Sequence, residues 1–363
     1  MFTLLQKNMI KIIYKITVLV IIIICSCSDK NKNMLVFEKE QNTDIECISI
    51  SLPTSDILGV SMQLLQIDSI LLINDFFGDS LIHVLDVKNK IEHGKMVAKG
   101  VGPNEFISPL GIFKTDSNLY IYERQTSRLF SLPIEMVLSQ HKNIKLNFTA
   151  NTQDEHSIIN NLFPLSDSMF IASKIDDGIK RFAVYNSKGE KVNEFGEFKA
   201  YWYREKDFSN RVRNFFHQTF FEKHPSQKMF VAYSGHILGI YRYESILHAP
   251  TLNKELLLSK YSYTFVENES YLSTGRDEGI ERGIVTVACS STYIYIVYNP
   301  NKKVDGKETS LPHSIKVIDW NGNPVQILNT GKRVSCLAID EIEKMGYIIS
   351  TDPEDKLMSF KLE

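Results

Sequence analysis

Residues 68–87, DSILLINDFFGDSLIHVLDV, consist of an apolar strand, a polar turn and a second apolar strand. Five later segments repeat this pattern, and the six strand pairs begin 49 to 64 residues apart. Steps of this size are typical of one four-stranded sheet per repeat. The pairs are ILLIND with DSLIHVLD (70–86), LYIYER with RLFSL (119–132), MFIASK with KRFAVYN (169–186), MFVAYS with ILGIYRY (229–243), YIYIVYN with SIKVIDW (293–320) and GYIIST with KLMSFKL (346–362).

The paired strands are apolar almost without interruption, as at Ile70–Ile73, which indicates that both of their faces are buried. Sheets that stack face to face around an axis bury their strands in this way. Shorter apolar segments precede the pairs, and we predict that they form the innermost strands: 61–67, 158–163, 215–221, 283–289 and 334–339. The segments at 90–97 and 191–198 are more polar and are predicted to be outer strands.

The last repeat ends on its third strand, so its sheet lacks an outer strand. Residues 45–52, IECISISL, alternate apolar and polar side chains, as expected of a strand with one solvated face. Joining this strand to the last repeat would close the ring and remove an exposed edge. We therefore predict an all-β fold, a six-bladed β-propeller closed by this N-terminal strand. Seven blades or two stacked β-sandwiches are the alternative assemblies.

Composition agrees with a large all-β domain. The chain has 363 residues, of which 43% are hydrophobic, and it contains 16 Tyr and 21 Phe. Such β-branched and aromatic runs favour strands. The 41 Lys and Arg residues nearly balance the 43 Asp and Glu residues, so charge does not indicate a nucleic-acid partner.

The N-terminus has the features of a lipoprotein signal peptide. Three lysines precede the apolar run 16–24, and Ser26 and Cys27 follow it. We predict that residues 1–26 are the signal peptide, that Cys27 carries the lipid, and that residues 27–44 form a tether. A transmembrane anchor is the alternative, but a membrane span needs about 20 apolar residues, roughly twice the length of this run.

The remaining residues, 45–363, are predicted to form a single propeller domain and a monomer. They contain Cys47, Cys289 and Cys336, none of which lies in a CxxC spacing. Three cysteines cannot all pair within the chain. Export would permit one disulfide, but small buried thiols are the interpretation that we favour.

Two turn motifs resemble those of a known family. The segments KGVGPNEF (99–106) and IKVIDWNGNPVQIL (315–328) are similar to those of the TolB-like six-bladed propeller lipoproteins of Gram-negative bacteria. The resemblance covers essentially all of the mature chain. It implies the same fold and an outer-membrane lipoprotein that faces the periplasm or the cell exterior, and it brings no catalytic residue with it.

The sequence carries no established catalytic motif. It has no HxH, HExxH or GxSxG, and Gly100–Gly102 lacks the third glycine and the helix of a dinucleotide-binding loop. Some six-bladed propellers are calcium-dependent hydrolases that gather carboxylates and amides on the axis. Glu105, Asn160 and Asn161 could contribute to such a site, but they fall short of a recognisable one. We therefore predict no cofactor, and calcium only under this alternative.

Topology suggests where a ligand could bind. Loops that lead into each innermost strand emerge on the same face as the turns inside each strand pair, and ligand sites usually lie in concave mouths. The longest such loop, AYWYREKDFSNRVRN (200–214), combines aromatic side chains, which stack on sugars, with arginines, which grip anions. The candidate ligand-binding residues are Glu105, Trp202, Tyr203, Arg204, Arg211, Arg213, Arg276, Arg282 and Arg333.

Both candidate loops also have a structural interpretation. The arginines of 200–214 could simply stack on the neighbouring aromatic side chains of the loop. The second candidate, STGRDEGIERG (273–283), could be no more than a solvated charged loop.

The leading functional hypothesis is a non-enzymatic, membrane-anchored propeller that binds a glycan, a peptide or a protein partner at the axial mouth of the loop face. The alternatives are a metal-dependent hydrolase or lyase and a structural role in an envelope complex.

Overall fold

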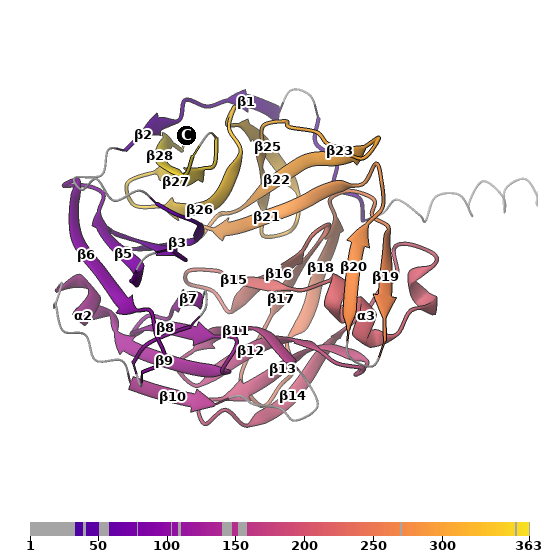
Figure 1. Ribbon diagram of the computed structural model, residues 1–363, viewed down its shortest axis with the longest axis horizontal. Coiled ribbons are helices and arrows are strands. Elements are labelled where there is room, and N and C mark those ends of the chain that lie inside the picture. Colours follow the sequence, from indigo (N-terminus) through magenta and orange to yellow (C-terminus); the bar gives the residue numbers. More distant parts are fainter. Residues whose placement is uncertain are drawn as a thin grey trace, which may run out of the picture.

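A computed structural model describes residues 33–38, 41–50, 58–77, 79–102, 104–107, 110–139, 147–151, 158–268, 271–352 and 354–362. Six sheets lie around a common axis, so the protein is a six-bladed β-propeller, as predicted (Figure 1). The predicted signal peptide and Cys27 lie outside the described residues.

The first four blades are regular four-stranded antiparallel sheets in chain order. The first contains β3 (Ser61–Ile67), β4 (Ile70–Asp75), β5 (Ser80–Asp86) and β6 (Ile91–Ala98). The second contains β7 (Leu110–Lys114), β8 (Asn118–Glu123), β9 (Arg128–Pro133) and β10 (Asn147–Asn151), with the short helix α2 (Ile134–Leu138) between its last two strands. The third contains β11 (Ile158–Ser166), β12 (Met169–Ile175), β13 (Lys180–Asn186) and β14 (Lys191–Glu197), and the fourth β15 (Phe220–Lys223), β16 (Met229–Ser234), β17 (Ile237–Arg242) and β18 (Thr251–Leu257).

The last two blades take strands from both ends of the chain. The fifth contains β21 (Glu281–Cys289), β22 (Tyr293–Val304), β24 (Ser314–Asp319) and β25 (Pro324–Asn329), with β23 (Lys307–Glu308) beside β22 and β1 (Asn42–Asp44) parallel to β25. The sixth contains β26 (Val334–Asp340), β27 (Met345–Ser350), β28 (Lys356–Lys361) and β2 (Ile48–Ser49).

The N-terminal strand lies where we predicted it, but it is shorter. Ile48 and Ser49 pair with Ser359 and Met358 of β28, as the outermost strand of the sixth sheet. Residues 51–57 of the connection to the first blade lie outside the described residues, so closure of the ring by this strand stays a prediction. The pairing of β1 with the fifth blade was not predicted, because its three residues, NTD, carry no apolar pattern.

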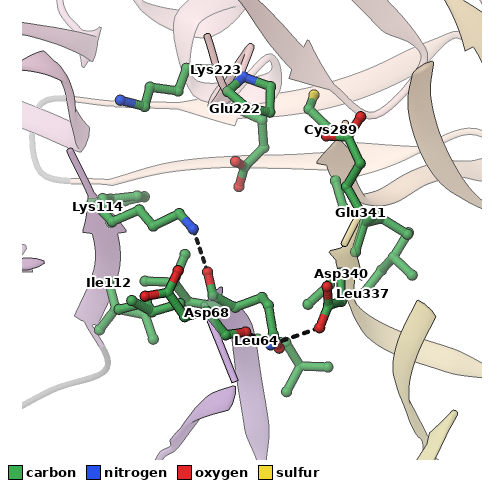
Figure 2. A pocket seen from close by; sticks show the side chains of 18 of the residues that line it. Leu64, Asp68, Ile112, Lys114, Glu222, Lys223, Cys289, Leu337, Asp340 and Glu341 are labelled. Carbon is green, nitrogen blue, oxygen red and sulfur yellow. Dashed lines mark hydrogen bonds between the residues drawn. The ribbon is translucent and has the colours of Figure 1, made fainter. Parts of the chain in front are cut away.

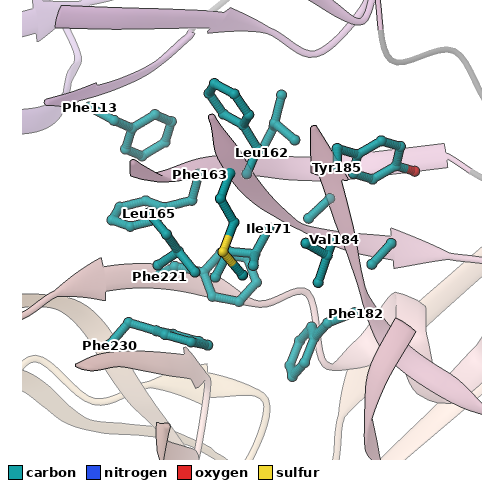
Figure 3. Close-up of a cluster of buried hydrophobic side chains, with 14 of the residues drawn as sticks. Phe113, Leu162, Phe163, Leu165, Ile171, Phe182, Val184, Tyr185, Phe221 and Phe230 are labelled. Carbon is teal, nitrogen blue, oxygen red and sulfur yellow. The ribbon is translucent and has the colours of Figure 1, made fainter. Parts of the chain in front are cut away.

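Burial on both faces holds the blades together. Every residue of β4, β12 and β16 is buried, as their continuous apolar sequences predict. Between the second, third and fourth blades, aromatic rings interlock, among them Phe182 and Phe221 with ring centroids 5.4 Å apart (Figure 3). Edge-to-face contacts of this kind add to the free energy gained from burial alone.

Two segments differ from the sequence interpretation. Residues 215–221 do not form one innermost strand, because Asn210–Phe216 form helix α3 and only the last two residues belong to β15. Ser209 caps this helix by accepting a hydrogen bond from the Val212 amide at 3.2 Å. Residues 273–283 are no open loop, since most of them belong to β20 (Leu272–Arg276) and β21.

The strand β20 pairs with β19 (Tyr263–Glu267) in a hairpin that the sequence analysis missed. The hairpin lies outside the six blades and beside α3 in Figure 1. No helix among the described residues is long and apolar enough to cross a membrane. Cys47, Cys289 and Cys336 are free thiols, but only Cys336 is fully buried, as we expected of all three, and the other two are half-buried.

The packing of side chains between blades leads to a prediction about stability. Phe182 is fully buried, so we expect Phe182→Ala to lower the free energy of unfolding by about 3 to 5 kcal/mol. Val192, on the outer strand β14, is 46% exposed, and Val192→Ala should change it by no more than about 0.5 kcal/mol. Urea unfolding of both variants measures the difference. Equal effects of the two substitutions would show that inter-blade packing does not carry the stability.

Candidate functional site

The longest predicted binding loop is folded against the protein. Within it, Glu205–Asp207 form the 3-10 helix η3, and α3 follows. The Trp202 ring packs on Phe208 and Tyr263, each with centroids 5.6 Å apart, and the Arg204 guanidinium lies 5.8 Å from the Trp202 ring. Tyr203, in contrast, is 76% exposed.

A buried carboxylate anchors this loop. Glu205 accepts hydrogen bonds from His217 at 2.5 Å, from the Tyr261 hydroxyl at 2.5 Å and from the Tyr263 hydroxyl at 3.0 Å. Burial acts to raise the pKa of the Glu205 carboxyl, but these hydrogen bonds outweigh burial and lower the pKa. Because the carboxylate is already fully engaged, it acts as a structural tie between the loop and the β19–β20 hairpin.

Most of the other predicted residues also have partners within the chain. Arg276 and Arg282 both lie near the Glu308 carboxylate, at 3.7 and 2.7 Å. Arg211 pairs with Glu267 at 3.7 Å, Arg333 with Asp352 at 3.3 Å, Arg213 donates to the Asn210 side chain, and Glu105 accepts from the Gly102 amide at 2.9 Å. The predicted residues are spread over four separate segments, and the structure does not bring them together in one cavity. Ligand binding by this surface stays a prediction.

The structure instead reveals a cavity of about 480 Å³ on the propeller axis. All six innermost strands line it (Figure 2). Representative lining residues are Leu64 of β3, Ile112 of β7, Phe163 of β11, Glu222 of β15, Cys289 of β21 and Leu337 of β26.

The cavity lies at the end of the axis opposite to the predicted binding loops. Its lining residues fall at the C-terminal ends of the innermost strands and in the turns that follow, such as Asp68, Asp116 and Glu341, all three of which are exposed. The arginine-containing loops lead into the N-terminal ends of the same strands. Our expectation that the axial mouth lies on the loop face therefore needs correction, because the hollow end belongs to the short turns. None of the predicted binding residues lines this cavity.

Five acids and two bases line the cavity: Asp68, Asp116, Glu222, Asp340 and Glu341, with Lys114 and Lys223. Figure 2 shows the Glu222 carboxyl and the Lys114 ammonium pointing into it from two different blades, the fourth and the second, while the Lys223 side chain points aside. Burial raises the pKa of Glu222 to about 8, although Lys114 and Lys223 act to lower it. Burial also lowers the pKa of Lys114 and that of Lys223.

A hydrogen bond holds the Lys114 ammonium in place, whereas none from a described residue holds the Glu222 carboxyl. The Lys114 ammonium donates to the Gln66 carbonyl at 2.5 Å, and the Gln66 amide in turn donates to Asp340 at 3.3 Å. Asp340 also accepts from two backbone amides of its own turn, those of Ile342 and Glu343. Among the described residues, no hydrogen bond or ion pair reaches the Glu222 carboxyl, so this group is available to a ligand.

The innermost strand predicted from the sequence, 215–221, ended one residue before Glu222. The predicted innermost strand ended at Phe221, yet β15 continues through Glu222 and Lys223. The available signal was an acid in a strand expected to be apolar. It was missed because a charged residue at a strand end is usually solvated.

The described residues do not form the calcium site that the hydrolase alternative would require. Among the residues that the structure describes, no group of three or more His, Cys, Asp or Glu side chains is arranged to hold a metal ion. Asn160 and Asn161 are buried in β11, and neither they nor Glu105 line the axial cavity.

Comparisons with known proteins agree with the architecture. The profile of the family described as TolB-like 6-blade propeller-like matches residues 37–342. A member of the DUF4221 family from Bacteroides vulgatus has a similar structure, with a TM-score of 0.54, 12% identity, and coverage of 92% of this chain and 99% of that one. A Bacteroides fragilis protein described as exported has a TM-score of 0.52 and 10% identity, with 89% and 99% covered. Identities this low show the fold alone, and no curated protein matches the sequence.

The pKa of Glu222 makes stability depend on pH. Because this pKa is raised to about 8, the folded protein keeps a proton that the unfolded chain releases above pH ~4.3. Folding therefore becomes less favourable as the pH rises through this window. From pH 5 to pH 8.5, we expect the wild type to lose at least about 1 kcal/mol of unfolding free energy relative to Glu222→Gln, as measured by urea unfolding. The exposed Glu244→Gln serves as the control, and an identical pH profile for all three proteins would contradict the assignment.

Proposed function

This chain belongs to the TolB-like six-bladed propeller family, and we propose that it is an exported, non-enzymatic binding protein that holds a small polar ligand in its axial cavity. The observation that carries this proposal is the Glu222 carboxyl, which points into a cavity lined by all six blades and has no partner among the described residues. A ligand that donates to this half-buried carboxyl gains a hydrogen bond that no described residue supplies.

The size and the walls of the cavity suit a small ligand. Ligand sites typically measure about 300 to 1,000 Å³, have mostly apolar walls and contain a few polar groups that orient the ligand. The axial cavity, at about 480 Å³, falls within this range. Its walls include Leu64, Ile112 and Phe163, and its polar groups come from separate blades.

Export and membrane attachment are part of the proposal. The lysines, the apolar run and Cys27 follow the order of a lipoprotein signal, and the similar Bacteroides fragilis protein is described as exported. We propose that lipid on Cys27 holds the propeller at the outer membrane of a Gram-negative cell. The tether would leave the domain in the periplasm or at the cell surface.

The arginine-containing loops form a second candidate surface, suited to a glycan, a peptide or a protein partner. The observation in its favour is Tyr203, which is 76% exposed beside Arg204 and Trp202. An exposed aromatic ring on a rigid scaffold is a common contact residue at interfaces. This surface and the cavity lie at opposite ends of the axis, so substitutions separate them.

The main experiment fills the cavity. Leu65 lines the cavity and is partly buried, so we expect Leu65→Trp to reduce its volume, whereas Val192→Trp adds the same side chain on an outer strand. The lipid-free domain of each variant is screened by thermal shift against neutral sugars, amino sugars, amino acids and dipeptides. A compound that raises Tm in wild type and Val192→Trp should lose at least tenfold in affinity for Leu65→Trp.

The loop variants complete this test. Trp202→Ala and Arg211→Ala should leave binding of the same compound within about twofold of wild type, because neither side chain lines the cavity. If these two variants lose binding while Leu65→Trp retains it, the ligand site is the loop surface and the cavity proposal is wrong. Circular dichroism confirms that each variant is folded.

A further inference from the structure

An acid and a base share the axial cavity without forming an ion pair. The Glu222 carboxyl and the Lys114 ammonium both point into the open space in Figure 2, yet no ion pair or hydrogen bond joins these two described residues. Glu222 keeps its proton below pH ~8, so it carries no charge that would draw the Lys114 ammonium into a direct pair in the empty cavity. The two groups come from non-adjacent blades, the fourth and the second.

Lys114 is fixed at a distance by its own hydrogen bond. Its ammonium donates to the Gln66 carbonyl at 2.5 Å, which uses one of its three donors and holds the side chain toward β3. Glu222 lies on β15, the innermost strand of the fourth blade, whereas Lys114 ends β7 in the second. The gap is therefore built into the positions of two blades.

Some of the other charged groups of the cavity have partners, whereas Asp68 and Asp116 lie in exposed turns, and the Asp68 carboxylate acts to raise the pKa of Lys114. Glu341 accepts from the Ser291 amide at 3.0 Å and from its hydroxyl, and Asp340 is occupied by its turn and by Gln66. The groups that face Glu222 or share its cavity are Lys223 on its own strand, Lys114 of β7, Tyr233 of β16, Cys289 of β21, Asp340 and Glu341 at the end of β26, and Asp68 and Asp116 in the exposed turns.

We propose that the ligand is a zwitterion, an α-amino acid or a dipeptide with an apolar side chain, whose ammonium pairs with Glu222 and whose carboxylate pairs with Lys114. The remaining two donors of Lys114 can reach a carboxylate, and the side chain of the ligand would lie against Leu64, Ile112 and Phe163. This inference rests on the proposed use of the cavity as the binding site, and it names the chemical class that the cavity takes.

The zwitterion model makes binding depend on pH in one direction. The ligand ammonium pairs with ionised Glu222, whose pKa in the empty cavity is raised to about 8 by burial. Below this pH, binding must first release the Glu222 proton. The affinity should therefore rise with pH between 6 and 8, by up to about tenfold per pH unit.

The experiment compares leucine, three of its derivatives and glucose as ligands of the lipid-free protein. Titration calorimetry at pH 6, 7 and 8 compares leucine, leucyl-leucine, N-acetyl-leucine, which lacks the ammonium, leucinamide, which lacks the carboxylate, and glucose. We expect leucine or leucyl-leucine to bind with an affinity that rises with pH, and the two blocked forms to bind at least tenfold more weakly.

Substitutions assign the two ends of the ligand. Glu222→Gln should lose at least tenfold in affinity for the zwitterion together with the pH dependence, while its affinity for N-acetyl-leucine should change little. Lys114→Met should lose affinity for the zwitterion, and Lys114→Arg should restore part of it. Glu244→Gln, at an exposed position outside the cavity, should stay within about twofold of wild type. Urea unfolding verifies that each variant is folded.

The possible failures can be told apart. If N-acetyl-leucine and leucinamide bind as tightly as leucine, or if only glucose binds, the zwitterion inference is wrong although the cavity still binds a ligand. If leucine binds equally well to Leu65→Trp, the cavity is not its site, and both the inference and the proposed function fail. Absence of binding by leucine and leucyl-leucine at pH 8 also overturns the inference.

Discussion

Burial of the middle strands on both faces is the constraint on which the rest of this structure depends. A strand such as β4 or β12, in which every residue is buried, needs a sheet on either side. Six sheets that stack around an axis bury both faces of these middle strands. Their innermost strands then converge at the centre, and their C-terminal ends surround the axial cavity.

Polar groups that are deeply placed elsewhere in the propeller show what is unusual about Glu222. Asp75 accepts hydrogen bonds from the amides of Gly59, Val60 and Phe77, and Glu123 accepts from the Ile107 amide and from Arg128. In both cases burial acts to raise the pKa of the carboxyl, and the hydrogen bonds lower it. Glu222 has no such donors among the described residues, and its pKa is raised. Carboxylates that stabilise loops and a carboxyl that is free for a ligand can thus be distinguished by their partners.

The insertion around α3 shows why a sequence rich in arginine and aromatic residues does not by itself define a binding site. Phe216 stacks on Tyr263 with ring centroids 3.6 Å apart, and both lie beside the Glu205 network. The β19–β20 hairpin and the long loop therefore pack as one unit against the fourth blade. Much of the aromatic character that suggested sugar binding is used in this packing, while Tyr203 remains exposed.

The number of blades, the strand pairs and the outer strand of the sixth sheet could all be predicted from local sequence, because strands buried on both faces appear as continuous apolar runs such as Ile70–Ile73. Only the tertiary structure decided which end of the axis is hollow and which charged groups meet there. Lys114 and Glu222 lie 108 positions apart in two different blades, and the sequence around either residue does not indicate that the other lies in the same cavity. They share one cavity because six sheets pack around one axis, a long-range consequence of packing that no single stretch of sequence contains.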